Sequence, residues 1–208
     1  MNRRGFTLVE LIISISIFVF LTTVTVFSFR GAGFASSVRS NGAILASTLR
    51  RMQSYAISGN SVRVCSDYSS NPRTCETATT CGGVLTCDAV VPTGGFGVAV
   101  LSANATAVSI FADLNNDQQY TAARDVLIET QTVNLTDKTR ISNGGGFPQV
   151  VVFGAQRGKP SFVPANGNAA NNTQYFCVSH PNFTGTYRKV IVNGITGSVD
   201  DVSQKNCP

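Results

Sequence analysis

The sequence predicts an α+β protein, in which a long amino-terminal helix packs on a head made of an antiparallel β-sheet or sandwich. Two observations lead to this fold class. Apolar residues with helical spacing extend from position 6 to about position 58, and alternation of apolar and polar residues follows them. The later apolar segments are short and follow one another without helices between them, which argues against a parallel nucleotide-binding sheet.

Composition limits the class of protein. The chain has 208 residues, a net charge of +5 and only 13% charged residues, so one domain, or one domain plus an anchor, is expected. The low share of charge argues against a disordered acidic or basic protein. A single histidine in the chain argues against a multi-histidine metal site and a Ser-His-Asp enzyme. We therefore predict that the protein is not an enzyme.

Residues 6–29 form an apolar segment whose one charged residue is Glu10. As a helix, this segment would extend about 36 Å, enough to cross a bilayer. It is too long for the apolar core of a cleaved secretory signal. Arg3 and Arg4 precede it and Arg30 follows it, and the first two place the amino terminus in the cytoplasm.

Residues 3–12, RRGFTLVELI, closely resemble the class III signal of type IV pilins and pseudopilins. The resemblance implies that residues 1–5 are a leader, which a prepilin peptidase removes by cutting after Gly5. It also implies N-methylation of the new terminus at Phe6 and retention of the 6–29 helix as a membrane and filament-core segment.

Glu10 is expected to act in assembly. Cleavage after Gly5 would create an α-amine on Phe6, and Glu10 of one subunit could pair with that amine on a neighbour. A carboxylate within an apolar segment is costly unless it has a partner. Removing one partner of a buried pair typically costs about 3–5 kcal/mol, so the pair would set the axial register of subunits.

A second helical segment, residues 30–60, continues the first. Its apolar positions fall on one face and are Phe34, Val38, Leu45, Leu49, Met52 and Ala56. Gly31, Gly33 and Gly42 would allow a bend or local melting, whereas an unbroken helix would be a rod of about 80 Å. Gly59 and Asn60 are expected to end it.

Residues 61–208 form the predicted β-rich head. Period-two alternation and turn residues indicate strands at 62–64, 96–100, 108–110, 126–134, 149–153, 174–179, 187–193 and 196–200, with a polar loop at 166–173. Residues 46–65 and, more loosely, 187–199 resemble the GspH/FimT group of minor pilins and secretion pseudopilins. Some members of that group bind DNA near the final hairpin, but residues 197–199 here contain no arginine.

Six cysteines in an exported head favour disulfides. Cys65, Cys75, Cys81 and Cys87 fall in a Cys-rich segment, residues 65–92, and permit three pairings. The remaining two favour a Cys177–Cys207 bond that would tie the tail to a strand. The segment has few apolar residues, so its disulfides are expected to replace a core.

An acidic turn is the candidate metal site. Oxygen ligands suited to Ca²⁺ are spaced along it, namely Asp113, Asn115, Asp117, Gln119 and Asp125. Gln118 stands where a calcium loop has glycine, and Arg124 where it has its last acid. The alternative is a turn held by Asp and Asn hydrogen bonds without metal.

Two further groups are expected to be unremarkable surface features. His180, before Pro181, is interpreted as a surface or turn residue. The basic residues are expected to be scattered and solvated, and they include Arg63, Arg73, Arg157, Lys159, Arg188 and Lys189.

Together these features predict a minor pilin or pseudopilin, a single-pass inner-membrane protein whose head lies in the periplasm or outside the cell. Its expected partners are other pilin or pseudopilin subunits, the prepilin peptidase, the inner-membrane assembly platform and the membrane itself. The alternative is a DNA- or surface-binding adhesin at a pilus tip. Calcium is the one candidate cofactor.

Overall fold

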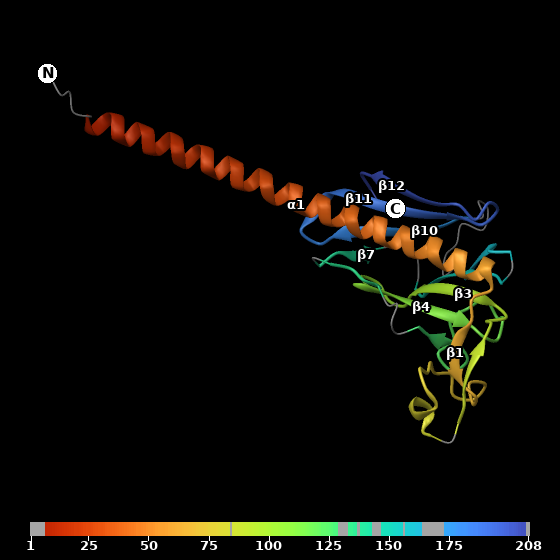
Figure 1. The fold of residues 1–208 in the computed structure, drawn as a ribbon. Coiled ribbons are helices and arrows are strands. Elements are labelled where there is room, and N and C mark those ends of the chain that lie inside the picture. The colour runs from red at the N-terminus through yellow and green to blue at the C-terminus, as the bar shows by residue number, and fades with distance from the viewer. Residues whose placement is uncertain are drawn as a thin grey trace.

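A computed structural model describes residues 7–83, 85–128, 133–136, 138–142, 147–155, 157–163 and 173–206. Figure 1 shows one long helix, α1 (Leu8–Ser58), whose first half projects away from a β-rich head. The α+β architecture predicted from the sequence is therefore confirmed. The helix is unbroken over 51 residues, about 76 Å at 1.5 Å per residue, so Gly31, Gly33 and Gly42 do not interrupt it.

The two ends of α1 have recognisable caps. Thr7 is the N-cap, and Gly59 is the C-cap in the left-handed region with φ 63°. The Gly59 N–H donates to the Tyr55 carbonyl, which satisfies one of the free carbonyls of the last turn. The end predicted at Gly59 and Asn60 is confirmed.

The strands of the head are all paired antiparallel. Within the part of the chain that the structure describes, they are β1 (Val62–Cys65), β2 (Cys87–Val90), β3 (Gly95–Val100), β4 (Ala107–Asp113), β5 (Val126–Leu127), β6 (Val133–Asn134), β7 (Arg140–Ser142), β8 (Gln149–Phe153), β9 (Pro160–Val163), β10 (Thr173–His180), β11 (Phe183–Asn193) and β12 (Val199–Gln204). A short 3-10 helix, Ala78–Cys81, lies between β1 and β2.

Several strand boundaries differ from the sequence expectation. The segment 126–134 is not one strand: β5 and β6 each pair separately with β4, and residues 129–132 lie outside the described ranges. The last strand begins at Val199 rather than 196, because residues 193–198 make the turn, in which Gly197 N–H donates to the Asn193 carbonyl at 2.8 Å. The predicted polar loop at 166–173 lies almost entirely outside the described residues.

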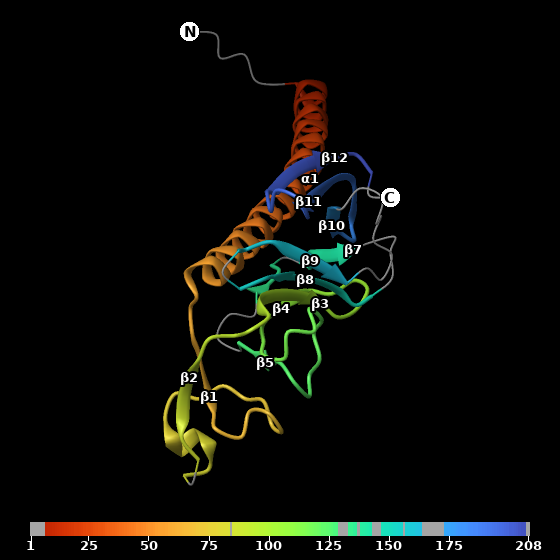
Figure 2. The same ribbon diagram turned by 90° about the vertical axis from the view of Figure 1, so that its right-hand side faces the viewer.

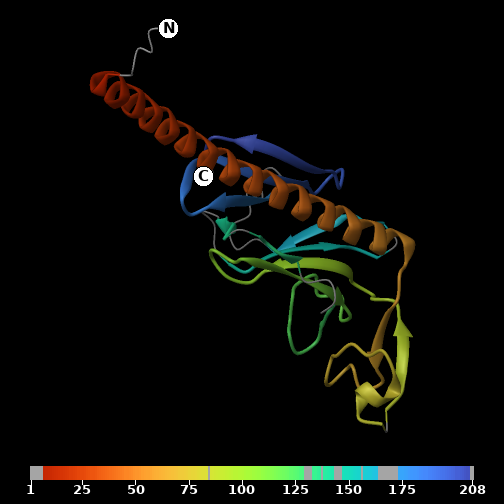
Figure 3. The same cartoon turned by 60° about the vertical axis from the view of Figure 1, so that its left-hand side comes forward.

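Two sheets and α1 enclose the core. The larger sheet has the order β5-β4-β3-β8-β9, with β6 also on β4, and the smaller has the order β12-β11-β10-β7. The helix contacts both, through β3 and β8 on one side and β10, β11 and β12 on the other. Figure 3 shows α1 lying along both sheets.

The buried face of α1 is the one that the sequence predicts. Five of its six positions are at most 1% exposed: Val38, Leu45, Leu49, Met52 and Ala56. Phe34, the first of the series, is half-buried. Most of this face joins one apolar cluster with the large strand residues Phe96, Phe153 and Phe176.

Residues 62–90 form a small disulfide lobe beyond the carboxyl end of α1. Its strands β1 and β2 pair only with each other among the named strands, and Figure 2 shows the lobe set apart from the two main sheets. The pairing that the sequence left open is Cys65–Cys81 and Cys75–Cys87. Cys65, Cys75 and Cys81 are at most 6% exposed and form the centre of the lobe, so disulfides do take the place of an apolar core.

The other expected bond is Cys177–Cys207. Cys177 is disulfide-bonded, but Cys207 lies outside the described residues, so the pair Cys177–Cys207 stays a prediction.

Gly42 lies where α1 packs tightly against β11. A Cβ atom on Gly42 would lie 2.8 Å from the Arg188 Cβ atom, whereas one on Gly33 would meet nothing within 4 Å. We expect Gly42→Ala to destabilise the head by about 1–3 kcal/mol through overpacking. Gly33→Ala, the matched control, should be neutral or stabilising by up to about 1 kcal/mol, because alanine is the better helix former. Urea unfolding of the full chain in detergent measures the stability change of each variant. Equal changes in the two variants would contradict close packing at Gly42.

Candidate assembly site

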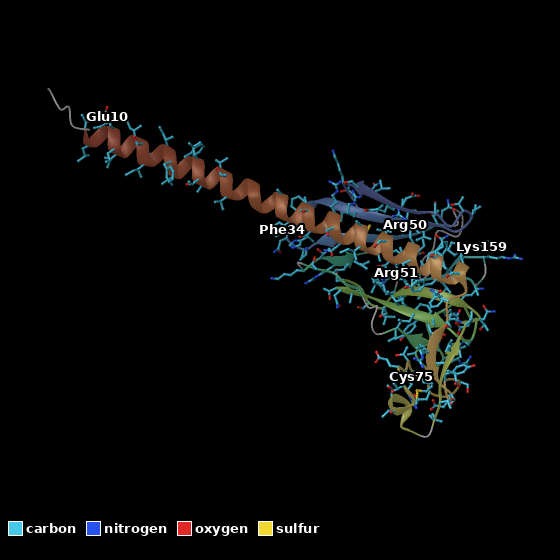
Figure 4. All side chains as sticks on the ribbon, viewed as in Figure 1. Glu10, Phe34, Arg50, Arg51, Cys75 and Lys159 are labelled. Atoms are coloured by element: carbon cyan, nitrogen blue, oxygen red, sulfur yellow. A yellow bond between two sulfur atoms is a disulfide. The ribbon has the colours of Figure 1, made fainter. Side chains whose placement is uncertain are left out.

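The amino-terminal half of α1 is apolar and exposed along its whole surface. Between Leu8 and Val26 the large apolar side chains are 52–74% exposed, and Figure 4 shows this half of the helix free of the head. By length and composition it is the one helix in the described ranges that could cross a membrane. An apolar surface of this extent requires a lipid or protein environment.

The hydroxyl groups in this half of α1 are compatible with a lipid environment. Ser14 donates to the Glu10 carbonyl at 2.8 Å and Thr25 to the Leu21 carbonyl at 2.6 Å. Ser16, Thr22 and Thr23 bond to carbonyls of the preceding turn in the same way. A hydroxyl that bonds to its own helix can enter hydrocarbon without leaving a polar group unpaired.

Glu10 lies in the first turn, at the outer end of the helix (Figure 4). It forms a capping box with Thr7: the Thr7 N–H donates to Glu10 Oε2 at 3.0 Å, and the Glu10 N–H donates to Thr7 Oγ1 at 3.3 Å. The Thr7 hydroxyl also donates to Glu10 Oε2 at 2.9 Å. The carboxylate is therefore held at the helix end, where the helix dipole favours a negative charge.

Thr7 is the site residue that our sequence reasoning missed. The Thr-x-x-Glu spacing before an apolar segment is itself a capping-box signal, so it was available in the sequence. Gly5 and Phe6, the predicted processing residues, lie outside the described part of the chain.

Comparison with known proteins supports the importance of this end of the chain. The family model for the prokaryotic N-terminal methylation motif matches residues 1–26. This match supports a type IV pilin-like prepilin. Membership of the GspH/FimT group is not confirmed by it, and no match was found among curated proteins or solved structures.

A type IV pilin-like motif indicates a structural, non-enzymatic subunit that assembles with other pilin subunits and the membrane machinery. The apolar helix and the motif together are consistent with an inner-membrane anchor. The remaining candidate residues are in the head.

The acidic turn follows β4 and is held by its own backbone. Both Asp113 oxygens accept main-chain N–H bonds, from Asn116 at 2.7 Å and from Gln118 at 3.0 Å. Asp125 likewise accepts from Leu114 at 3.3 Å and from Thr121 at 2.7 Å. Gln118, where a calcium loop would have glycine, adopts a φ of 60°.

Asn115, Asp117 and Gln119 take part in the same hydrogen-bonded turn. Asn115 Nδ2 donates to Asp117 Oδ2 at 2.7 Å, and the Gln119 N–H donates to Asp117 Oδ1 at 2.9 Å. Among the described residues, Asp113, Asp117 and Asp125 do not form a group of three whose ligand atoms lie within 4.8 Å of one another; Cys65, Cys75 and Cys81 do, and they are disulfide-bonded. The hydrogen-bonded turn accounts for the geometry, and calcium at this site stays a prediction.

Burial makes the two inner acids of this turn unusual. Asp113 and Asp125 are at most 2% exposed. Burial raises the pKa of Asp113, and it raises the pKa of Asp125 to about 6, with the nearby Asp113 charge adding to the effect. Backbone N–H bonds to both carboxyls oppose these shifts.

The interpretation of His180 as a surface or turn residue is right about the turn, which His180 flanks, and wrong about the surface. His180 ends β10, is 4% exposed, and stacks on Phe34 of α1 with 4.3 Å between ring centroids. Its Nδ1 atom accepts the N–H of Asn182 at 3.1 Å. The β10–β11 hairpin turns against α1 where the helix enters the head, and this tertiary contact buries the ring.

The expectation of scattered, solvated basic residues needs correction at three positions. Arg188 bonds to Asp201 at 2.7 Å, with both side chains less than a fifth exposed. Arg73 pairs with Asp67 at 3.2 Å in the disulfide lobe, and Lys189 lies 4.1 Å from the centre of the Tyr175 ring. Arg63, Arg157 and Lys159 are exposed, as expected.

The raised pKa of Asp125 predicts a pH dependence of stability. The folded protein holds this proton more tightly than the unfolded chain, whose reference pKa is 3.8. The resulting stabilisation is complete below about pH 4 and is lost as the pH rises through about 6. Asp125→Asn should therefore remove a decline in unfolding free energy on the order of 2–3 kcal/mol between pH 4 and pH 7.

Urea unfolding of the full chain at several pH values measures this slope. Asp88→Asn, at an exposed acid of the disulfide lobe, is the control and should keep the slope of the parent. If the unfolding free energies of the parent and of Asp125→Asn change with pH in parallel, the extra proton of the folded protein is not on Asp125.

Proposed function

We propose that the protein is a minor pilin or pseudopilin of the GspH/FimT group, a structural subunit of a type IV pilus or of a type II secretion-type filament. One observation carries the proposal: the methylation motif at residues 1–26 includes the part of α1, Leu8 to Val26, whose large apolar side chains are exposed on all sides. The same helix is then buried in the head from Val38 onward. A membrane-inserted subunit that later packs its helix into a filament core requires this division.

Processing follows from the sequence around Gly5. A prepilin peptidase at the cytoplasmic face removes residues 1–5 and methylates Phe6. The remaining helix stays in the inner membrane until the assembly platform extracts the subunit. The head is then presented in the periplasm or outside the cell.

Assembly uses Glu10. Its carboxylate is fixed at the amino end of α1 by Thr7, close in sequence to the amine that cleavage creates on Phe6. In a filament, the carboxylate of one subunit neutralises the amine of a neighbour, so that neither charge is alone in an apolar environment. The charge pair sets the register, and the apolar helix surfaces supply the attraction.

The alternative role, a DNA- or surface-binding adhesin at a pilus tip, has less support. Two of the basic residues of the head, Arg73 and Arg188, are already paired with acids. Residues 197–199 of the last hairpin contain no arginine.

Processing is tested by mass spectrometry of the protein from its native host. The mature chain should begin at N-methylated Phe6. Replacing Gly5 with a bulky residue should leave the unprocessed chain in the membrane, because Gly5 is the residue after which the motif implies the cut. A native protein that begins at Met1, or that has lost residues beyond 29, would refute the proposal.

The charge pair is tested by separating two roles of Glu10, as part of the helix cap and as the partner of the Phe6 amine on a neighbouring subunit. Glu10→Gln retains a side chain able to accept the Thr7 N–H but has no charge, and Glu10→Val has neither. Both should enter the membrane and be cleaved after Gly5, yet their recovery in sheared filaments should fall at least tenfold, because the Phe6 amine is left without a partner.

Thr7→Ala is the matched control for this experiment. It removes the hydroxyl of the capping box but leaves the Glu10 charge, so filament recovery should stay close to that of the parent. If Glu10→Gln assembles normally while Thr7→Ala does not, Glu10 acts as a helix cap and the intersubunit pair is wrong.

A further inference from the structure

We propose that four basic residues around the membrane-proximal end of the head bind the anionic headgroups of the bilayer in which α1 is anchored. The four residues are Arg39, Lys138, Arg140 and Lys205, and we call them the basic collar. All four are exposed, and none forms an ion pair with an acid in the described ranges. The inference rests on the membrane anchorage that the proposed function includes, and it does not require filament assembly.

The membrane-proximal end of the head is fixed by the contacts of Phe34. Phe34 stacks on His180, and its ring centroid lies 6.4 Å from that of Phe183. These two residues flank the β10–β11 turn. Figure 4 shows Phe34 where α1 enters the head, on the side facing Glu10, and Lys159 at the opposite end. The β10–β11 hairpin is therefore the part of the smaller sheet nearest to the membrane segment.

Strand register brings Lys138 and Arg140 to this end. Arg140 pairs with Ser179, next to His180. Lys138 lies in the turn that leads into β7, where the Thr139 N–H donates to the Thr136 carbonyl at 3.1 Å and Asn41 of α1 donates to the same carbonyl at 3.1 Å. Thr139, between the two, accepts a hydrogen bond from Asn41 of α1 at 2.9 Å, which places both cations close to the level of Arg39 on the helix.

Lys205 reaches the same level from the other edge of the sheet. Gln204 pairs with Tyr187 in the first half of β11, and the chain continues from Gln204 toward the hairpin end. On α1, the Cβ of Arg39 is tilted toward the amino terminus, as in every helix, so its side chain leans toward the membrane. The collar thus has members on the helix and on both edges of the smaller sheet.

The distance to the bilayer suits an electrostatic contact. If the apolar segment ends at Phe29, Phe34 lies about 8 Å and Arg39 about 15 Å farther along the helix axis. The polar layer on each side of a bilayer is about 5–8 Å thick, so the hairpin end of the head lies at the headgroups. The collar then lies about one screening length, or 8–10 Å, from the phosphates, and a modest tilt of α1 brings it into contact.

The charge pattern of the helix favours the same partner. The first part of the helix beyond the membrane segment, residues 30–44, contains two arginines and no acid, whereas the disulfide lobe and the acidic turn, residues 62–90 and 113–125, together contain six acids and three arginines. An anionic surface at the proximal end attracts the near charges and repels the far ones, which orients the head with the disulfide lobe away from the membrane. Each basic residue near an anionic surface contributes about fivefold to the binding constant, and the helix anchor keeps the head permanently within reach.

The four lysines of the chain allow a direct test in the full-length protein. Lys138 and Lys205 belong to the collar, Lys159 is exposed at the distal end, and Lys189 packs on Tyr175. The chain is reconstituted at one copy per nanodisc, in phosphatidylcholine alone or with 30% phosphatidylglycerol. The rate of acetylation of each lysine by an amine-reactive reagent is then measured by mass spectrometry.

We expect Lys138 and Lys205 to react at least threefold more slowly in the anionic discs, while Lys159 reacts equally in both. Salt at 0.5 M should remove the difference, because screening is then nearly complete. The double variant Arg39→Gln, Arg140→Gln should reduce the protection of Lys138, and Arg157→Gln at the distal end should not.

Equal rates for the collar lysines in the two kinds of disc would overturn the inference and leave the proposed function standing. Protection that appears only with several chains per disc would also overturn it, in favour of contact between heads. A full chain that cannot be inserted into nanodiscs would overturn both the anchor and the collar.

Discussion

The structure depends on the burial of one face of α1 against both sheets. Leu45, Leu49 and Met52 have no exposed surface and join the same apolar cluster as Phe96, Phe153 and Phe176. Fully burying a side chain of this size stabilises the fold by about 1.5–3 kcal/mol. Within the described structure, the helix joins the two sheets, helped by the bridge between Ala105 and Ile141. Loss of that face would therefore leave each sheet without a partner.

The same helix serves two environments because its two halves follow different patterns. From Leu8 to Val26 nearly every position is apolar or a hydroxyl that bonds to its own backbone. Beyond Val38 only one face is apolar, and the outer positions are serine, alanine and arginine, with Ile57 in the last turn as an exposed exception. The helix backbone is continuous between the two halves, so a movement of the membrane half is transmitted to the head. Gly42 has no side chain, which lets α1 lie close to β11 at that position.

The distal end of the head is stabilised by other means. The disulfide lobe has sulfur atoms where a core would be, and the acidic turn has buried carboxyls that satisfy main-chain N–H groups. Neither feature requires many apolar residues, which fits a sequence rich in Ser, Thr, Asn and Gly. Both features lie far from the exposed amino-terminal half of α1. The part of the helix to which we assign assembly and the disulfide-rich end of the molecule are thus physically separate.

Local patterns in the sequence determined the helix, its buried face, its end at Gly59, and the motif around Gly5 and Glu10. These features depend on residues within a few positions of one another, and the Thr7 capping box could have been predicted for the same reason. Tertiary structure alone decided which cysteines of the lobe pair, that His180 is buried under Phe34, and that Arg188 meets Asp201. It also split the segment 126–134 between two places on β4 and brought Arg39, Lys138, Arg140 and Lys205 to one end of the head. Each of these outcomes joins residues that are distant in sequence or chooses among several equally local pairings, and only the packing of α1 and the register of the strands fix which residues meet.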